Sequence, residues 1–484
     1  MRMRASIGPV AGRLAVLLVG AVVASSCTSE KITYRSEPSF TTPPAAAGNY
    51  VGYADTLTKQ TVCGTCHVDQ QAKWVTTKHA NAWADLQASG HAGASCVPCH
   101  TVGPNGNAAS DTMVGYVATK DARYEDVQCE SCHGAGLTHV TAPGLGNRPL
   151  ASIAVDTGTA FGNGCGECHT GSHDPFVDEW VKTADAGHAH PEAHALGNAS
   201  CTYCHVGQDA LTKWGVNTNY VEAGQSATNP MTITCAVCHD PHGGPNTAQL
   251  RYPINVADTA GNLCMRCHQR NGKPAAPASS YAPMAPEGPV LLGFAGWFPP
   301  NYTGPDTIVG THGSSANPNL CVTCHMGKMT VNDANGALVT SYMGHTFAAA
   351  PCLDAQGVPT TGACDISQRS FAACATSGCH GSPAAARSAM TAVEGRLALL
   401  DSALNSQLVQ IPATELKKTT MNTAIGAKFN LMLAEKVGSA EHNPFLMETL
   451  LTSSIKQVQM DYGIAPKISV NLANILPQMA ANNR

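Results

Sequence analysis

A five-residue motif, Cys-x-x-Cys-His, occurs eight times in this sequence. We number the motifs 1 to 8 in chain order, and their first cysteines are Cys63, Cys96, Cys129, Cys165, Cys201, Cys235, Cys264 and Cys321. Two thiols at this spacing can add across the two vinyl groups of a porphyrin, and the adjacent imidazole can bind the iron. Each motif therefore predicts one covalently attached c-type haem.

Cysteine pairs of the CxxC type also bind zinc or form disulfides. With 20 His in 484 residues, a histidine should follow a given position by chance roughly once in 24 cases. Here it follows every CxxC pair. The repeated histidine therefore favours haem over zinc or disulfides.

The motifs define the attachment thiols and the proximal iron ligands. The second thiols are Cys66, Cys99, Cys132, Cys168, Cys204, Cys238, Cys267 and Cys324. The proximal ligands are His67, His100, His133, His169, His205, His239, His268 and His325.

The segment CATSGCHG contains a related arrangement, with Cys374, Cys379 and His380 and four residues between the thiols. We expect a ninth haem at this motif 9 because the terminal Cys-His pair is retained. Cys352 and Cys364 would then form one disulfide. The alternative is two disulfides among these four cysteines.

Histidines outside the motifs are numerous enough to give each iron a second imidazole, as low-spin electron-transfer haems usually have. The expected distal ligands are His79, His91, His139, His188, His194, His242, His312, His345 and His442, with His173 and His190 as further candidates. A single histidine of this kind can also be a surface residue. Spacing alone does not assign a histidine to an iron.

The first six motifs form two similar groups of three. Motif 1 is followed by KWVTTKHANAW with Trp74, and motif 4 by EWVKTADAGHAH with Trp180. We interpret residues 61–142 and 163–245 as two trihaem modules, with a seventh haem appended at motif 7.

Two segments resemble known families. Residues 235–268, with a PHGG turn between two motifs, resemble the doubled CxxCH motif of bacterial multihaem cytochromes. Residues 63–139, with CESCHGAGLTH, are similar to tetrahaem cytochromes of nitrifying bacteria and to their octahaem hydroxylamine-oxidoreductase and tetrathionate-reductase relatives. The resemblance implies closely packed haem pairs that pass electrons along the array, with His242 as a distal ligand.

Composition sets the expected fold class. Only 5% of the residues are aromatic, and 46 Gly and 30 Pro limit regular structure. We expect a mainly irregular and α-helical multihaem cytochrome, with the haem stack as its core and loops and short helices around it. The multihaem array would span residues 61–270, a Pro/Gly-rich loop 271–311, the eighth and ninth haems 312–384, and a helical region 385–484.

The helical region has its own sequence signals. Apolar residues from Met390 to Leu408 recur at three- and four-residue steps, which predicts an amphipathic helix. Asn443 and Pro444 are typical of an N-cap and a first helical residue. The inner face of the second helix would include Met447, Leu450, Leu451 and Ile455.

Residues 1–26 combine three arginines with an apolar run and predict a secretory signal peptide. Cys27 is an expected lipidation site, with an ordinary cleavage site as the alternative, and residues 27–60 would be a flexible spacer. Cleavage changes the formal charge from −5 to −8, which argues against a nucleic-acid partner. We expect an exported protein that is periplasmic or an outer-membrane lipoprotein, with the cell surface as a further alternative.

These features favour an exported cytochrome that relays electrons between redox proteins or to an extracellular acceptor. Two alternatives remain open: a reductase of nitrite, hydroxylamine or a sulfur oxyanion with one open haem, and a homo-oligomeric filament. No CxxCK variant occurs, so an electron carrier is favoured over an enzyme, and no catalytic residue is assigned.

Overall fold

The computed structural model describes residues 41–155, 164–171, 173–186, 196–216, 218–277, 282–300, 302–360, 362–375 and 378–467. The expected signal peptide and the candidate ligands His188, His190 and His194 lie outside these residues. From Pro43 onward the described chain belongs to one compact unit.

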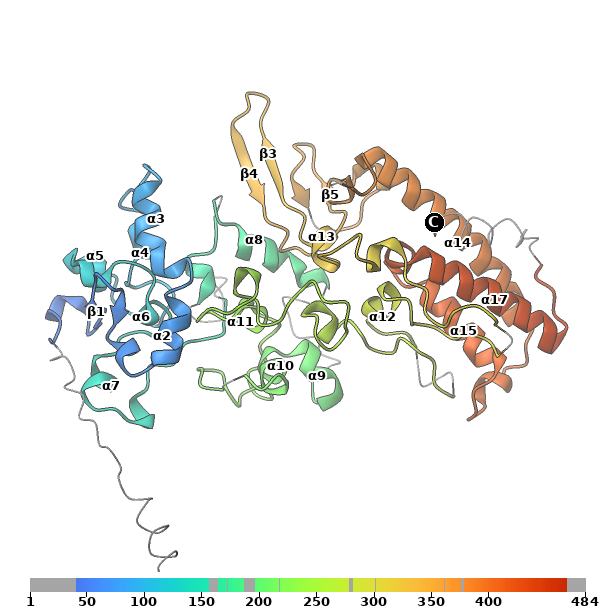
Figure 1. Cartoon of the computed structure of the whole chain (residues 1–484), viewed down its shortest axis with the longest axis horizontal. Helices are drawn as coiled ribbons and strands as arrows, with labels where there is room; N and C mark the ends of the chain where they lie inside the picture. Colours follow the sequence, from blue (N-terminus) through green and yellow to red (C-terminus); the bar gives the residue numbers. More distant parts are fainter. Residues whose placement is uncertain are drawn as a thin grey trace, which may run out of the picture. The chain divides into compact units, whose positions relative to one another are not determined.

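Short helices joined by irregular segments carry the haem motifs (Figure 1). The α-helices up to motif 8 are α2 (Val68–Trp74), α3 (Ala82–Ala88), α4 (Val97–His100), α5 (Gly115–Thr119), α6 (Cys129–His133), α7 (Leu137–Thr141), α8 (Phe176–Trp180), α9 (Ala199–His205), α10 (Gly207–Lys213), α11 (Cys235–Cys238), α12 (Glu287–Leu291) and α13 (Cys321–His325). None of these exceeds seven residues.

Strands are equally short and form three two-stranded antiparallel sheets in the described residues. The pairs are β1 (Tyr53–Asp55) with β2 (Gln60–Thr61), β3 (Met329–Asn332) with β4 (Leu338–Tyr342), and β5 (Cys352–Leu353) with β6 (Pro359–Thr360). The prediction of a mainly irregular, α-helical fold is confirmed.

The largest apolar cluster lies in the C-terminal helices α14 (Pro383–Leu408), α15 (Thr423–Ala434) and α17 (Pro444–Tyr462). The short helix α16 (Ser439–His442) precedes α17. The predicted helix start is confirmed, since the Asn443 side chain accepts a hydrogen bond from the Leu446 amide at 3.0 Å. The predicted inner-face residues Met447, Leu450, Leu451 and Ile455 are buried.

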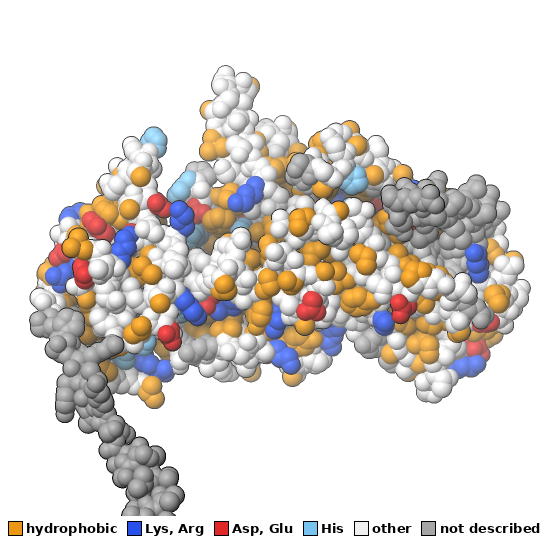
Figure 2. Space-filling model, viewed as in Figure 1, with side chains coloured by type: hydrophobic (Ala, Val, Ile, Leu, Met, Phe, Trp, Pro, Cys, Tyr) orange, Lys and Arg blue, Asp and Glu red, His pale blue; other side chains and the backbone are white. Residues whose placement is uncertain are grey.

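Apolar clusters around the motifs are small by comparison and separate from one another. Figure 2 shows hydrophobic side chains spread over the visible face of the motif-bearing part. This distribution is expected where a cofactor supplies much of the buried surface.

Part of the Pro/Gly-rich segment is fixed to the C-terminal helices. The Trp297 amide donates to Asn430 Oδ1 at 2.7 Å, and Asn430 Nδ2 donates to the Trp297 carbonyl oxygen at 2.7 Å. Asn430 is fully buried in α15. Among the described helices, none has the length and apolar character needed to span a bilayer.

Candidate haem-binding sites

Each motif places its first cysteine and its histidine on one turn of backbone. In motifs 1, 2, 4, 6 and 7 the histidine amide donates to the carbonyl oxygen of the first cysteine at 2.9 to 3.2 Å. Motifs 3, 5 and 8 lie in α6, α9 and α13. The thiols and the imidazole of each motif are thereby held at one short stretch of chain, as attachment to a single porphyrin requires.

Motif 9 has the same hydrogen bond between its histidine amide and its first cysteine, although it has two additional residues between the thiols. The His380 amide donates to the Cys374 carbonyl oxygen at 3.2 Å. Cys374 and Cys379 are not disulfide-bonded, whereas Cys352 and Cys364 form a disulfide. The predicted Cys352–Cys364 disulfide is confirmed.

Hydrogen bonds at Nδ1 orient many of the proximal imidazoles. The ring donates to a backbone carbonyl oxygen in His100 (Ala82, 2.9 Å), His133 (Pro149, 3.0 Å), His239 (Ala248, 2.7 Å) and His325 (Phe347, 2.7 Å). A bond at Nδ1 fixes the tautomer in which Nε2 binds a metal. These four rings are therefore oriented as iron ligands.

Two further proximal imidazoles contact a carboxylate instead of a carbonyl group. Nδ1 of His169 lies 2.6 Å from Asp174 Oδ2, and Nδ1 of His268 lies 3.1 Å from Glu287 Oε2. Sequence reasoning missed both acids. Asp174 lies only five residues after His169, so its closeness in sequence could have indicated this contact. Glu287 lies in the distant Pro/Gly-rich segment, and nothing in the sequence indicated that it faces His268.

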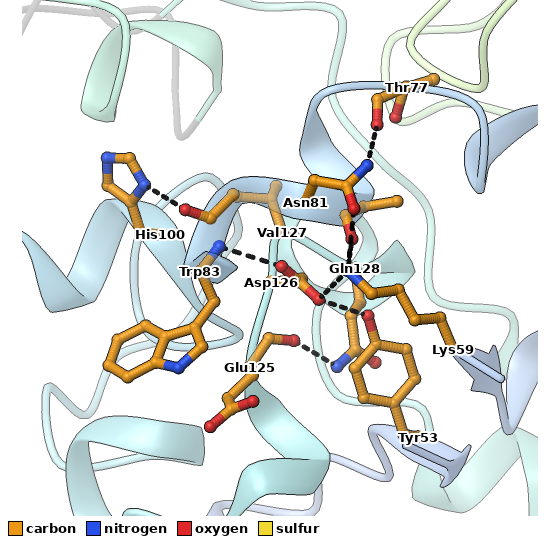
Figure 3. Close-up of polar contacts among 12 residues, drawn as sticks. Tyr53, Lys59, Thr77, Asn81, Trp83, His100, Glu125, Asp126, Val127 and Gln128 are labelled. Carbon is orange, nitrogen blue, oxygen red and sulfur yellow. Dashed lines mark hydrogen bonds and ion pairs between the residues drawn. The ribbon is translucent and has the colours of Figure 1, made fainter. Parts of the chain in front are cut away.

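The polar contacts around motif 2 show how the backbone is held at these sites (Figure 3). Buried Asp126 accepts hydrogen bonds from the Tyr53 hydroxyl at 2.8 Å and the Trp83 amide at 2.9 Å. It also pairs with Lys59 Nζ at 3.1 Å. This carboxylate joins β1 to the start of α3, the turn that provides the carbonyl oxygen bound by His100.

Each of five proximal histidines faces the imidazole of a second histidine, and the distance between the two rings is nearly the same in all five pairs. The ring centroids are 6.0 to 6.5 Å apart in the pairs His79–His169, His133–His242, His239–His345, His325–His442 and His312–His380. An iron about 2.0 Å from each of two opposed imidazole nitrogens gives a centroid separation of about 6 Å. The residues therefore fit bis-imidazole haem iron, and each pair would hold one.

Three of the second imidazoles, those of His79, His345 and His442, are suited to bind iron as neutral ligands. Burial and the neighbouring His169 lower the pKa of His79 to about 4. Burial likewise lowers the pKa of His345 and of His442 to about 4, with a further contribution from the paired histidine. Nδ1 of His345 and of His442 is buried and has no hydrogen-bond partner among the described residues.

Other expected distal ligands are not paired in this way. Among the described residues, no histidine ring lies against His67 or His100 at the spacing of the five pairs. His91 is exposed, and His139 donates from Nδ1 to Asn147 Oδ1 at 3.2 Å. His173 lies close enough to Cys99 of motif 2 for an electrostatic interaction.

Thiols of different motifs contact one another in a regular order. Side-chain contacts join the first cysteines of motifs 1 and 3, 4 and 6, and 7 and 8 (Cys63–Cys129, Cys165–Cys235, Cys264–Cys321). The second cysteines join motif 2 to motif 4 and motif 5 to motif 7 (Cys99–Cys168, Cys204–Cys267).

Weaker electrostatic interactions between thiols connect these pairs of motifs. Cys132 of motif 3 interacts with Cys165 of motif 4. Cys238 of motif 6 interacts with motif 7, and Cys324 of motif 8 with motif 9. Neighbouring motifs therefore follow the continuous order 1, 3, 4, 6, 7, 8, 9, with motif 2 beside motif 4 and motif 5 beside motif 7.

The same tertiary contacts occur in each of the two predicted modules. Trp74 Nε1 donates to the Val127 carbonyl oxygen at 2.9 Å, and Trp180 Nε1 donates to the Ile233 carbonyl oxygen at 3.2 Å, with a sequence separation of 53 in both cases. Thr77 and Thr183 each donate to the preceding tryptophan carbonyl oxygen at 2.7 Å.

Comparison with known families supports both resemblances seen in the sequence. The model of the family "Cytochrome c554 and c-prime" matches residues 62–134, and the "Doubled CXXCH motif" model matches residues 229–273. Together the matches cover parts of both predicted modules.

Curated relatives are multihaem cytochromes as well. The C-type polyheme cytochrome OmcB of Geobacter sulfurreducens is 25% identical over 292 residues, which cover 50% of this chain and 37% of OmcB. The multiheme cytochrome MtrA of Shewanella baltica is 22% identical over 197 residues, covering 37% of this chain and 54% of MtrA. The chain thus spans less than two thirds of the length of either relative.

Among solved structures, the outer cell wall cytochrome OcwA aligns with a TM-score of 0.48 and 19% identity, over 75% of this chain and 76% of OcwA. The eight CxxCH motifs, the two family matches and the curated relatives identify this chain as a bacterial multihaem c-type cytochrome.

Proposed function

We propose that this protein is an exported electron carrier that relays electrons through nine haems, most of them with two imidazole ligands. The observation that carries the proposal is the continuous series of thiol contacts and weaker thiol–thiol electrostatic interactions between neighbouring motifs. Haems attached to these neighbouring thiols would be close enough to exchange electrons directly. Haem c supplies an iron that takes up and releases one electron at a time.

The main route would follow haems 1, 3, 4, 6, 7, 8 and 9, numbered after their motifs. Haem 2 would branch from haem 4, and haem 5 from haem 7. The first cysteines of motifs 7 and 8 contact each other as those of motifs 1 and 3 do. We therefore propose that motifs 7 and 8 form a third, shorter module, which lacks a middle motif equivalent to motifs 2 and 5.

The imidazole pairs supply the proposed distal ligands. His79 would bind haem 4, His242 haem 3, His345 haem 6, His442 haem 8 and His312 haem 9. The role of these residues is to hold each porphyrin between two planar ligands that change little between oxidation states. A rigid six-coordinate iron suits electron transfer rather than substrate binding.

The ninth haem is tested by the intact mass of the purified protein. We expect nine haems in the native chain and eight in the Cys374→Ala/Cys379→Ala variant. Cys352→Ala/Cys364→Ala is the control. It also replaces two cysteines, but these form the disulfide, so this variant should keep nine haems. A native mass that fits only eight haems would exclude this site.

Export and location rest on the sequence. The signal-like residues 1–26 agree with haem attachment outside the cytoplasm, and Cys27 would provide a lipid anchor to a periplasmic or outer-membrane surface. The partners would be redox proteins or an extracellular acceptor.

A carrier and a reductase differ in the coordination of their iron. Electron paramagnetic resonance of the oxidised protein should show only low-spin haem. Reduced methyl viologen should reduce all haems, and ferric citrate should then reoxidise them. A high-spin signal that changes on addition of nitrite or hydroxylamine would favour the reductase instead.

A further inference from the structure

Two of the haem positions are junctions of the array. The thiols of motif 4, Cys165 and Cys168, contact motifs 2 and 6 and interact electrostatically with motif 3. The thiols of motif 7, Cys264 and Cys267, contact motifs 5 and 8 and interact electrostatically with motif 6. An electron that travels along the whole main route would pass both haems, and one that enters from a branch would pass at least one of them.

The same two motifs have the proximal imidazoles that face carboxylates. Asp174 Oδ2 is 2.6 Å from Nδ1 of His169, and Glu287 Oε2 is 3.1 Å from Nδ1 of His268. The proximal histidines of motifs 2, 3, 6 and 8 donate to neutral carbonyl groups. Haems 4 and 7 therefore differ from haems 2, 3, 6 and 8 by one negative charge at the proximal ligand.

A third carboxylate near an axial ligand provides an internal contrast. Asp240 lies 3.3 Å from Nδ1 of His242 but also pairs with Arg251 at 3.6 Å. Within the described part of the chain, neither Asp174 nor Glu287 has an arginine or lysine partner. Their charge is therefore not offset by a neighbouring base.

We infer that Asp174 and Glu287 are positioning residues that make haems 4 and 7 harder to reduce than haems 2, 3, 6 and 8. The inference rests on the proposed relay for the meaning of the junctions, and on the two hydrogen bonds for the effect on potential.

The physical cause is the preference of a negative charge for the more positive iron. Reduction adds one electron to Fe(III) and gives Fe(II), no bond is broken, and the Nδ1 proton stays on the imidazole. A carboxylate acceptor increases the basicity of the ligand and stabilises Fe(III), so the reduction potential falls. Electrons would therefore occupy the stretches between the junctions first and cross haems 4 and 7 only transiently.

The test is a reductive titration of the full holoprotein followed by visible and electron paramagnetic resonance spectra. In Asp174→Asn one of the low-potential haems should become easier to reduce, with about a tenfold larger equilibrium constant, or about 59 mV for one electron. Asp178→Asn is the matched control. Asp178 lies in the same segment but accepts hydrogen bonds from Thr170 and Gly171 instead of a histidine.

Glu287→Gln should shift a second low-potential haem in the same direction, and Asp174→Glu should restore most of the native curve. A titration of Asp174→Asn that coincides with that of Asp178→Asn, at full haem content by mass, would overturn the inference. Loss of haem 4 from Asp174→Asn together with an unchanged Glu287→Gln titration would also overturn it.

Failure of the relay itself would be seen differently. The protein would then not pass electrons from methyl viologen to ferric citrate, while the shift in potential would remain. The two outcomes can therefore be distinguished.

Discussion

The imidazole of His79, which follows motif 1, lies 6.0 Å from that of His169, which belongs to motif 4. The two residues come from different predicted modules. The same holds for His242, which follows motif 6 and faces His133 of motif 3. In the proposed ligation, these two pairs would join the modules through iron, in addition to the contacts between their polypeptides.

Replacement of a proposed distal ligand should expose one iron. In His312→Gly we expect haem 9 to become high-spin while the mass still fits nine haems, because His312 faces His380 at 6.0 Å and Cys374 and Cys379 still attach the porphyrin. Electron paramagnetic resonance would measure the change.

Added imidazole provides the control for His312→Gly. It should occupy the vacated position and restore the low-spin signal. A low-spin spectrum of His312→Gly before imidazole is added would show that His312 is not the ligand.

Removal of haem 6 should interrupt the main route, whereas removal of haem 5 should not. The variants are Cys235→Ala/Cys238→Ala/His239→Ala and, as the matched control, Cys201→Ala/Cys204→Ala/His205→Ala. Motif 6 is the proposed link between motifs 4 and 7, and motif 5 contacts motif 7 as a branch.

Single-molecule conductance between contacts at the exposed positions 111 and 459 would compare the two deletions. We expect the conductance to fall by orders of magnitude without haem 6 and to stay near the native value without haem 5. Equal loss in both variants would contradict the branched order.

Glu130→Gln should loosen the N-terminal module. The buried Glu130 carboxylate accepts backbone hydrogen bonds from Val51, Gly52 and Gly136 at 2.7 to 3.0 Å, and a glutamine amide cannot accept at both positions. The cost should be about 1.5–3 kcal/mol. Hydrogen exchange at these three amides should therefore accelerate about ten- to a hundredfold.

Glu125→Gln serves as the control for this exchange experiment. Its side chain is only half-buried, and its backbone carbonyl oxygen is the group that accepts from Gln128. Similar exchange rates in the two variants would show that the Glu130 carboxylate does not hold this strand.

The C-terminal helices should lose stability as the pH rises from about 4 to about 7. Burial, with a smaller contribution from Glu435, raises the pKa of Asp401 to about 7. In this range the folded protein keeps a proton that the unfolded chain releases, so a higher pH favours unfolding. Asp401→Asn should remove this slope and melt at a higher temperature than the native protein at pH 8.

Thermal unfolding of the helices, monitored by circular dichroism at pH 5, 6, 7 and 8, would test the effect. Asp306→Asn, a change at an exposed aspartate, should leave the native slope unchanged. If Asp401→Asn keeps that slope as well, another group is responsible.

Local sequence signals predicted most of the fold described here. The Asn443–Pro444 pair predicted the start of α17 because capping depends on neighbouring residues. The recurring Trp74 and Trp180 predicted a repeat, and each of these tryptophans donates to a carbonyl oxygen 53 positions further along the chain.

The pairing of imidazoles could not be predicted in this way. His312 and His380, or His325 and His442, are far apart in sequence, and only the folded backbone brings their rings together. Glu287 illustrates the same limit, since nothing in its own segment indicates that it faces His268.

The proposed ligation would also affect how the chain matures. His242 faces His133, and His345 faces His239, so in these two pairs the second histidine is synthesised long after the motif histidine. A chain truncated before these second histidines would therefore carry irons with one imidazole and an open coordination position. Full ligation of haems 3 and 6 would then require a chain that extends at least to His345.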